Sequence, residues 1–331
     1  MVYRIYHKIL VLLFLLFWVE GGWTSTLEVT DHLGRKVTLQ VPVKRAVVVI
    51  AYELIPALDI WDSVVGVSRW AVENCGVIKT WMQRDRTKQK TSVGEATDLH
   101  LETLYKLKPD VVITWGYYPK LLNFLEQKGI RVIAINPEGL TDLYETIRLF
   151  GKIFGKEKRA EEVISEMEKI FQFIRERVRD LPLGKRRKVL YLGGTPTRVY
   201  GKIGVISDVI QIIGAKNVAE DLPVRYADVS VERIIQWNPD VIYIWGNAKY
   251  DESWIYGNSQ WQILKAVKRR EVYKLPKWSS WSPKLAPLAL LMATKTYPEL
   301  FKDINFESKV DEFYRRVFGV SFKEVKRYEG L

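Results

Sequence analysis

The pattern of apolar and polar residues predicts helices alternating with strands along most of the chain. Uninterrupted apolar runs rich in β-branched residues predict strands at 46–50, 111–114, 132–135, 189–192 and 241–244. Residues with helical spacing lie between these runs, as at 120–127. Continuous apolar strands that follow helices are typical of parallel strands covered on both faces. A hairpin at 27–30 and 37–39, turning at Leu33-Gly34, precedes them.

One segment occurs twice, at an offset of 130 residues. Residues 98–116 read DLHLETLYKLKPDVVITWG and residues 228–246 read DVSVERIIQWNPDVIYIWG, with seven of nineteen positions identical. A period this long indicates two similar domains rather than a solenoid. The sequence therefore predicts an α/β protein with two Rossmann-like lobes, each built on a parallel sheet. Each copy is expected to contain a helix N-cap, a proline that ends the helix and a Trp-Gly corner. In the first copy these are Asp98, Pro109 and residues 115–116, and in the second they are Asp228, Pro239 and residues 245–246.

A long helical segment separates the two copies. Residues 141–154 have helical spacing interrupted by Gly151 and Gly155, whereas 156–181 contain no helix breaker. An apolar stripe follows the second part, at Ala160, Val163, Ile164, Met167, Ile170, Phe171, Ile174 and Val178. The 26 residues from 156 to 181 would extend about 39 Å as a helix. We therefore expect one long rigid helix, rather than a flexible linker, to join the lobes. The predicted division is a first lobe at 27–140, a helical segment at 141–184 and a second lobe at 185–331.

The N-terminal residues have the features of an export signal. Arg4 and Lys8 flank the start of an apolar run at 9–19, which Gly21 and Gly22 follow. Such a run is too short to span a bilayer comfortably, since about 20 residues are needed. We predict a signal peptide at 1–21 and a location in the periplasm or on the extracellular face of the cytoplasmic membrane. An uncleaved anchor is the alternative, and a bacterial lipoprotein anchor is excluded because no cysteine follows the run.

The amino-acid composition argues against several kinds of functional site. The formal charge is +12, from 51 Lys and Arg against 39 Asp and Glu, but the basic residues are scattered and indicate no nucleic-acid partner. Cys75 is the only cysteine, so an intramolecular disulfide is excluded, and three histidines argue against a multi-histidine metal site. Neither a P-loop nor a dinucleotide-binding glycine motif occurs. We predict a monomer with no catalytic residues, no metal site and no resident cofactor.

The order of the motifs resembles that of a known family. The chain contains DHLGRKVTLQVP, VVVIAYELIPALDIWDSVVGVS, LHLETLYKLKPDVVI, the long helix, IGAKNVAED and VSVERIIQWNPDVIYI. This order is similar to that of the periplasmic substrate-binding proteins of ABC importers for ferric siderophores, haem and cobalamin. The resemblance covers essentially the whole mature chain. It implies two lobes that hold a metal chelate between them and deliver it to a permease driven by an ATPase. Because the connecting helix resists bending, we expect the lobes to close only modestly on binding.

The strand positions indicate where a ligand would bind. In open parallel sheets ligands bind beyond the carboxyl ends of the strands, so two facing lobes would form a cleft between those ends. Aromatic side chains there would stack on a flat chelate, and arginines would neutralise its anionic groups. The predicted ligand-binding residues are Tyr52, Trp70, Trp115, Tyr117, Arg198, Tyr200, Arg225, Tyr226, Trp245, Trp278 and Trp281, and Glu53, Tyr118 and Asn247 lie in the same stretches.

The resemblance also implies that Glu102 and Glu232 dock to the permease, one from each copy of the repeat. Pairing of carboxylates with arginines would add orientation as well as attraction. Core packing or a solvated surface is the alternative for each site residue. The ligand stays open among siderophore, haem and cobalamin complexes, a nickel complex and a bare oxyanion. A chelatase-like enzyme and a ligand-sensing domain are the alternative functions on the same bilobed fold.

Overall fold

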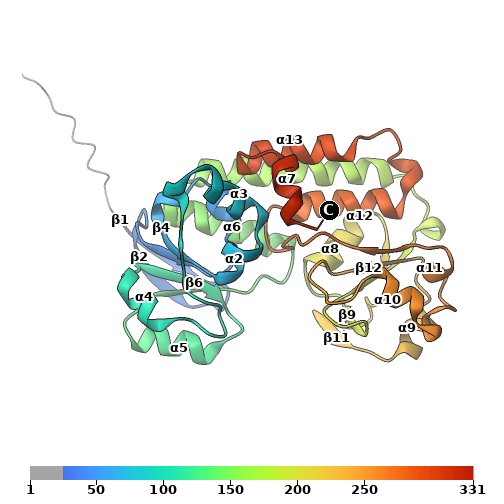
Figure 1. Ribbon diagram of the computed structural model, residues 1–331, viewed down its shortest axis with the longest axis horizontal. Helices are drawn as coiled ribbons and strands as arrows, with labels where there is room; N and C mark the ends of the chain where they lie inside the picture. The colour runs from blue at the N-terminus through green and yellow to red at the C-terminus, as the bar shows by residue number, and fades with distance from the viewer. Residues whose placement is uncertain (1–24, 331) are drawn as a thin grey trace, which may run out of the picture.

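Two α/β lobes lie side by side beneath a layer of long helices (Figure 1). The computed structural model describes residues 25–330, so the predicted signal peptide lies outside the described residues. The helical layer consists of α7 (Glu157–Val178), α12 (Leu285–Thr296) and α13 (Phe306–Phe318). None of the helices formed by residues 25–330 has the length and apolar character needed to cross a membrane.

The first lobe contains a five-stranded sheet in which every strand is parallel to its neighbours. In spatial order the strands are β5 (Thr91–Ser92), β4 (Val64–Val67), β3 (Ala46–Val48), β6 (Val111–Trp115) and β7 (Val132–Ile135). The predicted hairpin is confirmed as β1 (Ser25–Thr30) and β2 (Lys36–Val41). The helices of this part of the chain are α1 (Leu54–Ala57), α2 (Arg69–Asn74), α3 (Gly76–Arg84), α4 (Leu101–Leu107), α5 (Pro119–Gln127) and α6 (Leu140–Phe154).

The second lobe contains a mixed sheet. Its parallel strands are β8 (Lys188–Leu192), β10 (Lys216–Asn217), β12 (Val241–Ile244) and β13 (Val272–Lys274). The strands β9 (Arg198–Tyr200) and β11 (Tyr226–Asp228) run antiparallel at one edge, a common addition to α/β sheets that the apolar pattern did not predict. The remaining α-helices are α8 (Val205–Ile212), α9 (Val231–Trp237), α10 (Glu252–Gly257), α11 (Lys265–Lys268) and α14 (Phe322–Val325).

The sequence repeat forms the same structural unit in each lobe. The helices α4 and α9 begin and end 130 residues apart, and β6 and β12 follow them. Lys108 and Asn238 end the two helices in the left-handed conformation, with φ of 45° and 46°. Asp110 and Asp240 then each accept a 2.9 Å hydrogen bond from a backbone N–H at the entrance of β3 or β8. The repeated aspartate therefore fixes the strand that follows the helix against its neighbour in the sheet.

The predicted N-caps are wrong. Helix α4 starts after His100 without a side-chain cap, and α9 is capped by Ser230, whose hydroxyl accepts from the backbone N–H three residues on. Asp98 instead accepts a 3.1 Å hydrogen bond from the backbone of the preceding loop, and Asp228 pairs with Arg198 on the adjacent strand. The two aspartates thus stabilise the segments that lead into the helices.

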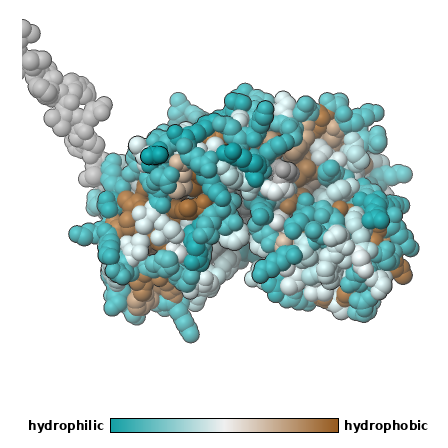
Figure 2. Space-filling model, in the orientation of Figure 1, coloured by the Kyte–Doolittle hydropathy of each residue, from teal (hydrophilic) through white to brown (hydrophobic). Residues whose placement is uncertain are grey.

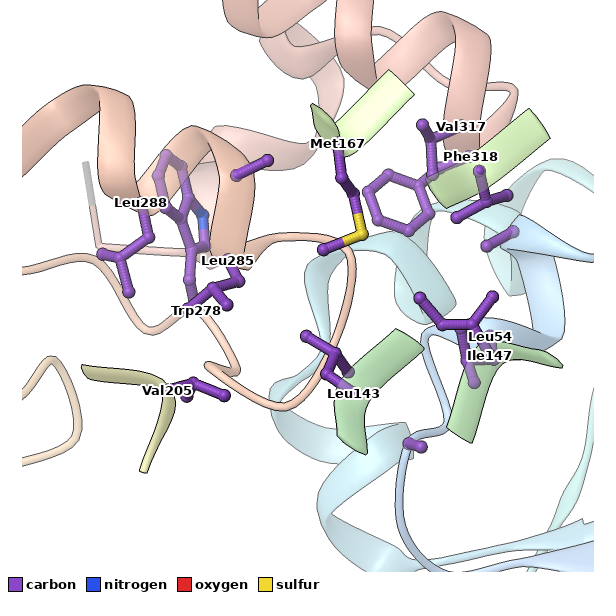
Figure 3. Packing of buried hydrophobic residues seen from close by; sticks show 14 of the residues in the cluster. Leu54, Leu143, Ile147, Met167, Val205, Trp278, Leu285, Leu288, Val317 and Phe318 are labelled. Atoms are coloured by element: carbon purple, nitrogen blue, oxygen red, sulfur yellow. The ribbon is translucent and has the colours of Figure 1, made fainter. Parts of the chain in front are cut away.

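The predicted long helix is present, but it is part of a shared core. Helix α7 has 22 residues and, apart from the partly exposed Ile170, buries the predicted stripe. Gly151 lies inside α6 rather than interrupting it. Its lack of a side chain allows α6 and α7 to pack closely, since an added Cβ would lie 2.8 Å from the Cβ of Ala160 on α7. Figure 3 shows Met167 of α7 between Leu285 of the second lobe and Leu54 of the first. One continuous apolar cluster therefore joins the lobes.

The C-terminal segment returns to the first lobe. The indole of Trp81 on α3 donates a 2.8 Å hydrogen bond to the carbonyl of Phe318, and Arg84 forms an ion pair with Glu324 of α14 at 2.5 Å. Part of the segment predicted as the second lobe, 185–331, thus packs on the first. The lobes are joined by α7 and also by this returning segment.

The two Trp-Gly corners provide a matched test of packing within the two lobes. A Cβ added at Gly246 would lie 2.0 Å from the carbonyl oxygen of Pro276, whereas the nearest atoms at Gly116 are side-chain carbons at 3.2 Å. We expect Gly246→Ala to lower the free energy of unfolding by about 2–3 kcal/mol, since the backbone must move, and Gly116→Ala by less than about 1 kcal/mol. Urea unfolding followed by circular dichroism measures both, and equal losses would contradict this account.

Candidate functional site

A cavity of about 290 Å³ lies between the two lobes. The residues that line it follow β3, β4 and β5 and end β6 in the first lobe, and follow β12 and β13 in the second. Figure 2 shows the surface hollowed between the lobes. The carboxyl ends of parallel strands therefore meet at this cavity from both sides, which is where open α/β sheets bind ligands.

Indole rings from both lobes form much of the cavity wall. Trp70 and Trp115 come from the first lobe, and Trp245 and Trp281 from the second. Trp115 meets Trp281 edge-on across the lobe boundary, with ring centroids 6.4 Å apart and an interplanar angle of 85°. On its other side Trp115 stacks with Tyr117 at 5.1 Å. The structure thus brings the two equivalent tryptophans of the repeat to one cavity, as the sequence predicted.

The charged groups of the cavity are two carboxyls and one ammonium, on Glu53, Glu95 and Lys277. Glu95 accepts a 2.6 Å hydrogen bond from the backbone N–H of Trp70, which lowers its pKa, but burial outweighs this and leaves the pKa raised. Burial also raises the pKa of Tyr52 well above its ordinary value, so its hydroxyl is protonated and can donate. The cavity therefore contains both hydrogen-bond donors and hydrogen-bond acceptors, without a strong positive charge.

A buried ionic cluster lies at the inner end of this site. Lys284, which is 1% exposed, forms an ion pair with Glu329, and its Nζ lies 3.9 Å from Oε1 of Glu53. Glu329 also accepts hydrogen bonds from the Trp278 indole and, at 2.8 Å, from the Tyr314 hydroxyl. The neighbouring carboxylates outweigh burial and raise the pKa of Lys284. The lysine is therefore charged, and it links the cavity wall to the C-terminal segment.

Arg225 connects the lobes at the edge of the cavity. Its guanidinium donates a 2.7 Å hydrogen bond to the carbonyl of Pro137 in the first lobe. The same group lies 5.1 Å from the ring centre of Tyr117 and 5.0 Å from that of Trp281. Burial lowers the pKa of Arg225. The arginine therefore joins the aromatic groups of the two lobes instead of projecting freely into the cleft.

Six of the eleven predicted ligand-binding residues do not line the cavity. Two of them, Tyr117 and Arg225, contact the aromatic residues of its wall, as described above. The other four are Arg198, Tyr200, Tyr226 and Trp278. Arg198 pairs with Asp228 at 2.6 Å, and Tyr200 and Tyr226 lie opposite one another on β9 and β11. These strands were not predicted from the apolar pattern. Trp278 is 2% exposed and packs in the core, where its indole donates to Glu329. The structure therefore places this set outside the cavity wall, although Trp281, from the same stretch as Trp278, lies in it.

Several cavity residues carry no distinctive sequence signal. Ser68 and Glu95 follow the short strands β4 and β5, and Lys277 follows β13; none of these strands was predicted from apolar runs. Cys75, to which no role was assigned, lines the cavity but is buried, and burial raises its pKa to about 12. Its thiol is therefore protonated at neutral pH. Within residues 25–330, no three His, Cys, Asp or Glu side chains are grouped so that they could hold a metal ion.

The two predicted docking glutamates lie on α4 and α9, at the lower ends of the lobes in Figure 1. The side chain of Glu102 is 83% exposed and pairs with Lys106 at 2.7 Å. Hydrogen bonds with its own backbone and with Ser230 lower the pKa of Glu232, which is therefore ionised at neutral pH. Both carboxylates are exposed and separated by the gap between the lobes.

Comparison with known proteins agrees with this architecture. The profile of the periplasmic binding protein family matches residues 50–278. The molybdate-binding protein MolA of Haemophilus influenzae is 27% identical over 326 residues, which cover 89% of this chain and 92% of MolA. The vitamin B12-binding protein of Salmonella typhi is 25% identical, over 59% of this chain and 70% of its own.

Solved structures show the same fold. CeuE of Helicobacter pylori, determined with Ni(II) bound, has a TM-score of 0.79 and 27% identity, covering 92% of this chain and 99% of its own. MolA bound to molybdate has a TM-score of 0.76 over 89% of this chain and 99% of its own, at 24% identity. Since the family profile spans more than half of the sequence, this chain belongs to the periplasmic binding protein family, whose members are substrate-binding proteins of ABC transporters and not enzymes.

Proposed function

We propose that this protein captures a metal chelate between its lobes, outside the cytoplasmic membrane, and delivers it to an ABC permease with its ATPase. The chelate is of the ferric siderophore, haem or cobalamin type. The observation that carries the proposal is the cavity at the carboxyl ends of both sheets, with indole rings contributed by each lobe. Flat aromatic walls bury the apolar faces of a ligand, while the hydroxyl, amide and carboxyl groups between them fix its orientation.

A bare oxyanion is the second candidate, because the Haemophilus relative is named for molybdate. The cavity contains serine hydroxyls and one lysine that could donate to an anion. It also contains Glu53 and Glu95, and a dianion placed beside a carboxylate is repelled. The balance of charges therefore favours a chelate with polar substituents over an oxyanion alone.

Titration of the purified protein tests the choice of ligand. The probes are haemin, cyanocobalamin, a ferric catecholate complex and sodium molybdate, and the readout is quenching of tryptophan fluorescence. We expect saturable quenching by one of the three chelates, since indoles line the cavity, and none by molybdate. A response to molybdate alone would replace the chelate with the oxyanion.

The aromatic wall gives a second prediction. Trp115→Ala should weaken binding of the responding chelate by at least about tenfold, because it removes a ring that both stacks on the ligand and contacts Trp281. Trp254→Ala is the matched control, since that indole is 43% exposed and lies outside the cavity wall. Isothermal titration calorimetry measures both affinities. Equal affinities would show that the ligand does not use this wall.

Docking to the permease is proposed to use Glu102 and Glu232. Both lie on exposed helices, one on each lobe, on the side of the molecule away from α7 (Figure 1). Apolar groups gather beside α4 in a shallow pocket lined by Leu101, Tyr118 and Phe124. A surface that combines one carboxylate per lobe with an apolar area has the composition of a protein interface.

The double variant Glu102→Ala with Glu232→Ala should retain ligand affinity and lose uptake by cells that carry the transporter. The control pair is Glu157→Ala with Glu176→Ala, two exposed carboxylates on α7 at the opposite side of the molecule. Both double variants remove the same charge, so a difference in uptake between them depends on where the glutamates lie on the protein. Normal uptake by the first variant would exclude these glutamates from docking.

A further inference from the structure

One carboxyl oxygen in the cavity wall has no partner. Glu53 is 2% exposed, and its Oε2 accepts no hydrogen bond from any residue in the described range 25–330. Buried polar atoms are nearly always paired, because an unpaired one loses the hydrogen bonds that water provides in the unfolded chain. Since Glu53 lines the ligand cavity, the missing donor is one that a ligand can supply.

The ionic cluster beside Glu53 does not use this carboxyl group fully. Lys284 is ion-paired with Glu329, and the distance from its Nζ to Oε1 of Glu53 is 3.9 Å, too long for a hydrogen bond. Glu329 additionally accepts hydrogen bonds from Trp278 and Tyr314. The cluster therefore holds two carboxyl groups for one ammonium, and Glu53 is the one to which Lys284 forms no hydrogen bond.

The two carboxyl groups differ in what their removal would leave behind. Desolvation is the largest influence on Glu53 and raises its pKa, and the attraction of Lys284 opposes this only in part. Removal of Glu329 would leave the buried ammonium without its close partner, whereas removal of Glu53 would leave a one-to-one ion pair. A buried acidic group that costs stability is retained where it serves a function.

We propose that Glu53 is a ligand-binding residue that accepts a hydrogen bond from an N–H or O–H donor on the bound chelate. This inference rests on the proposed function and narrows its ligand class. A metal-bound water, an amide and an amine each carry such a donor, whereas molybdate carries none at neutral pH. Glu53 therefore selects for donor-bearing chelates and against bare oxyanions.

The test compares Glu53→Met and Glu53→Gln with Glu329→Gln in the whole protein. Glu53→Met removes the acceptor and should weaken binding of the responding chelate by roughly tenfold or more, and Glu53→Gln, which keeps a carbonyl oxygen, should lose less. Both should melt at the wild-type temperature or above it. Glu329→Gln should melt at a lower temperature, because it breaks the buried ion pair.

The possible outcomes separate the two proposals. Wild-type affinity in both Glu53 variants overturns the role of Glu53 and leaves the proposed function intact. A melting temperature of Glu53→Met that falls as far as that of Glu329→Gln shows a structural role and also overturns the inference. If wild-type protein responds to molybdate alone, or to none of the haemin, cyanocobalamin and ferric catecholate probes, the proposed function fails and this inference fails with it.

Discussion

The architecture at the cavity depends on the pairing of one buried lysine. Lys284 stands at the start of α12, Glu329 follows α14, and Glu53 immediately precedes α1 of the first lobe. Removal of one member of a buried ion pair typically costs about 3–5 kcal/mol, because the other charge is left without compensation. The backbone of Glu329 also accepts a 2.8 Å hydrogen bond from Lys277, whose side chain lines the cavity. This pairing therefore positions the wall of the site and the end of the chain together.

The same contacts limit how far the lobes can move. A hinge requires a few residues that absorb a change of backbone angle between bodies that are otherwise independent. Here one apolar cluster runs from the first lobe through α7 to the second, and the C-terminal helices pack back on α3. Arg225 adds a polar contact from the second lobe to Pro137. Opening would disrupt packed side chains and buried hydrogen bonds, so ligand binding is expected to cause only a small closure.

The sequence was informative where a structural unit repeats locally. The offset of 130 residues located both Trp-Gly corners, the helices before them and the strands between, because each unit is specified by its own apolar pattern and breakers. Gly66 interrupts the apolar run of β4, and β5 has only two residues, so Ser68 and Glu95 were missed. Trp278 and Trp281 stand three residues apart, but Trp278 is buried and donates to Glu329, some fifty residues later, whereas Trp281 lines the cavity. Contacts between distant segments are not visible as periodicity.

The repeat also explains which parts of the site can vary. Its two copies provide the symmetric features, namely the tryptophans at the cavity, the glycines behind them and the exposed glutamates on α4 and α9. Glu53, Glu95 and Lys277 all lie outside the repeated segments, and both carboxyls come from one lobe. Polar groups that a ligand leaves unpaired discriminate more strongly than apolar walls do. Ligand choice in this fold can therefore change through the non-repeated residues, while the frame and the exposed glutamates of the repeat stay the same.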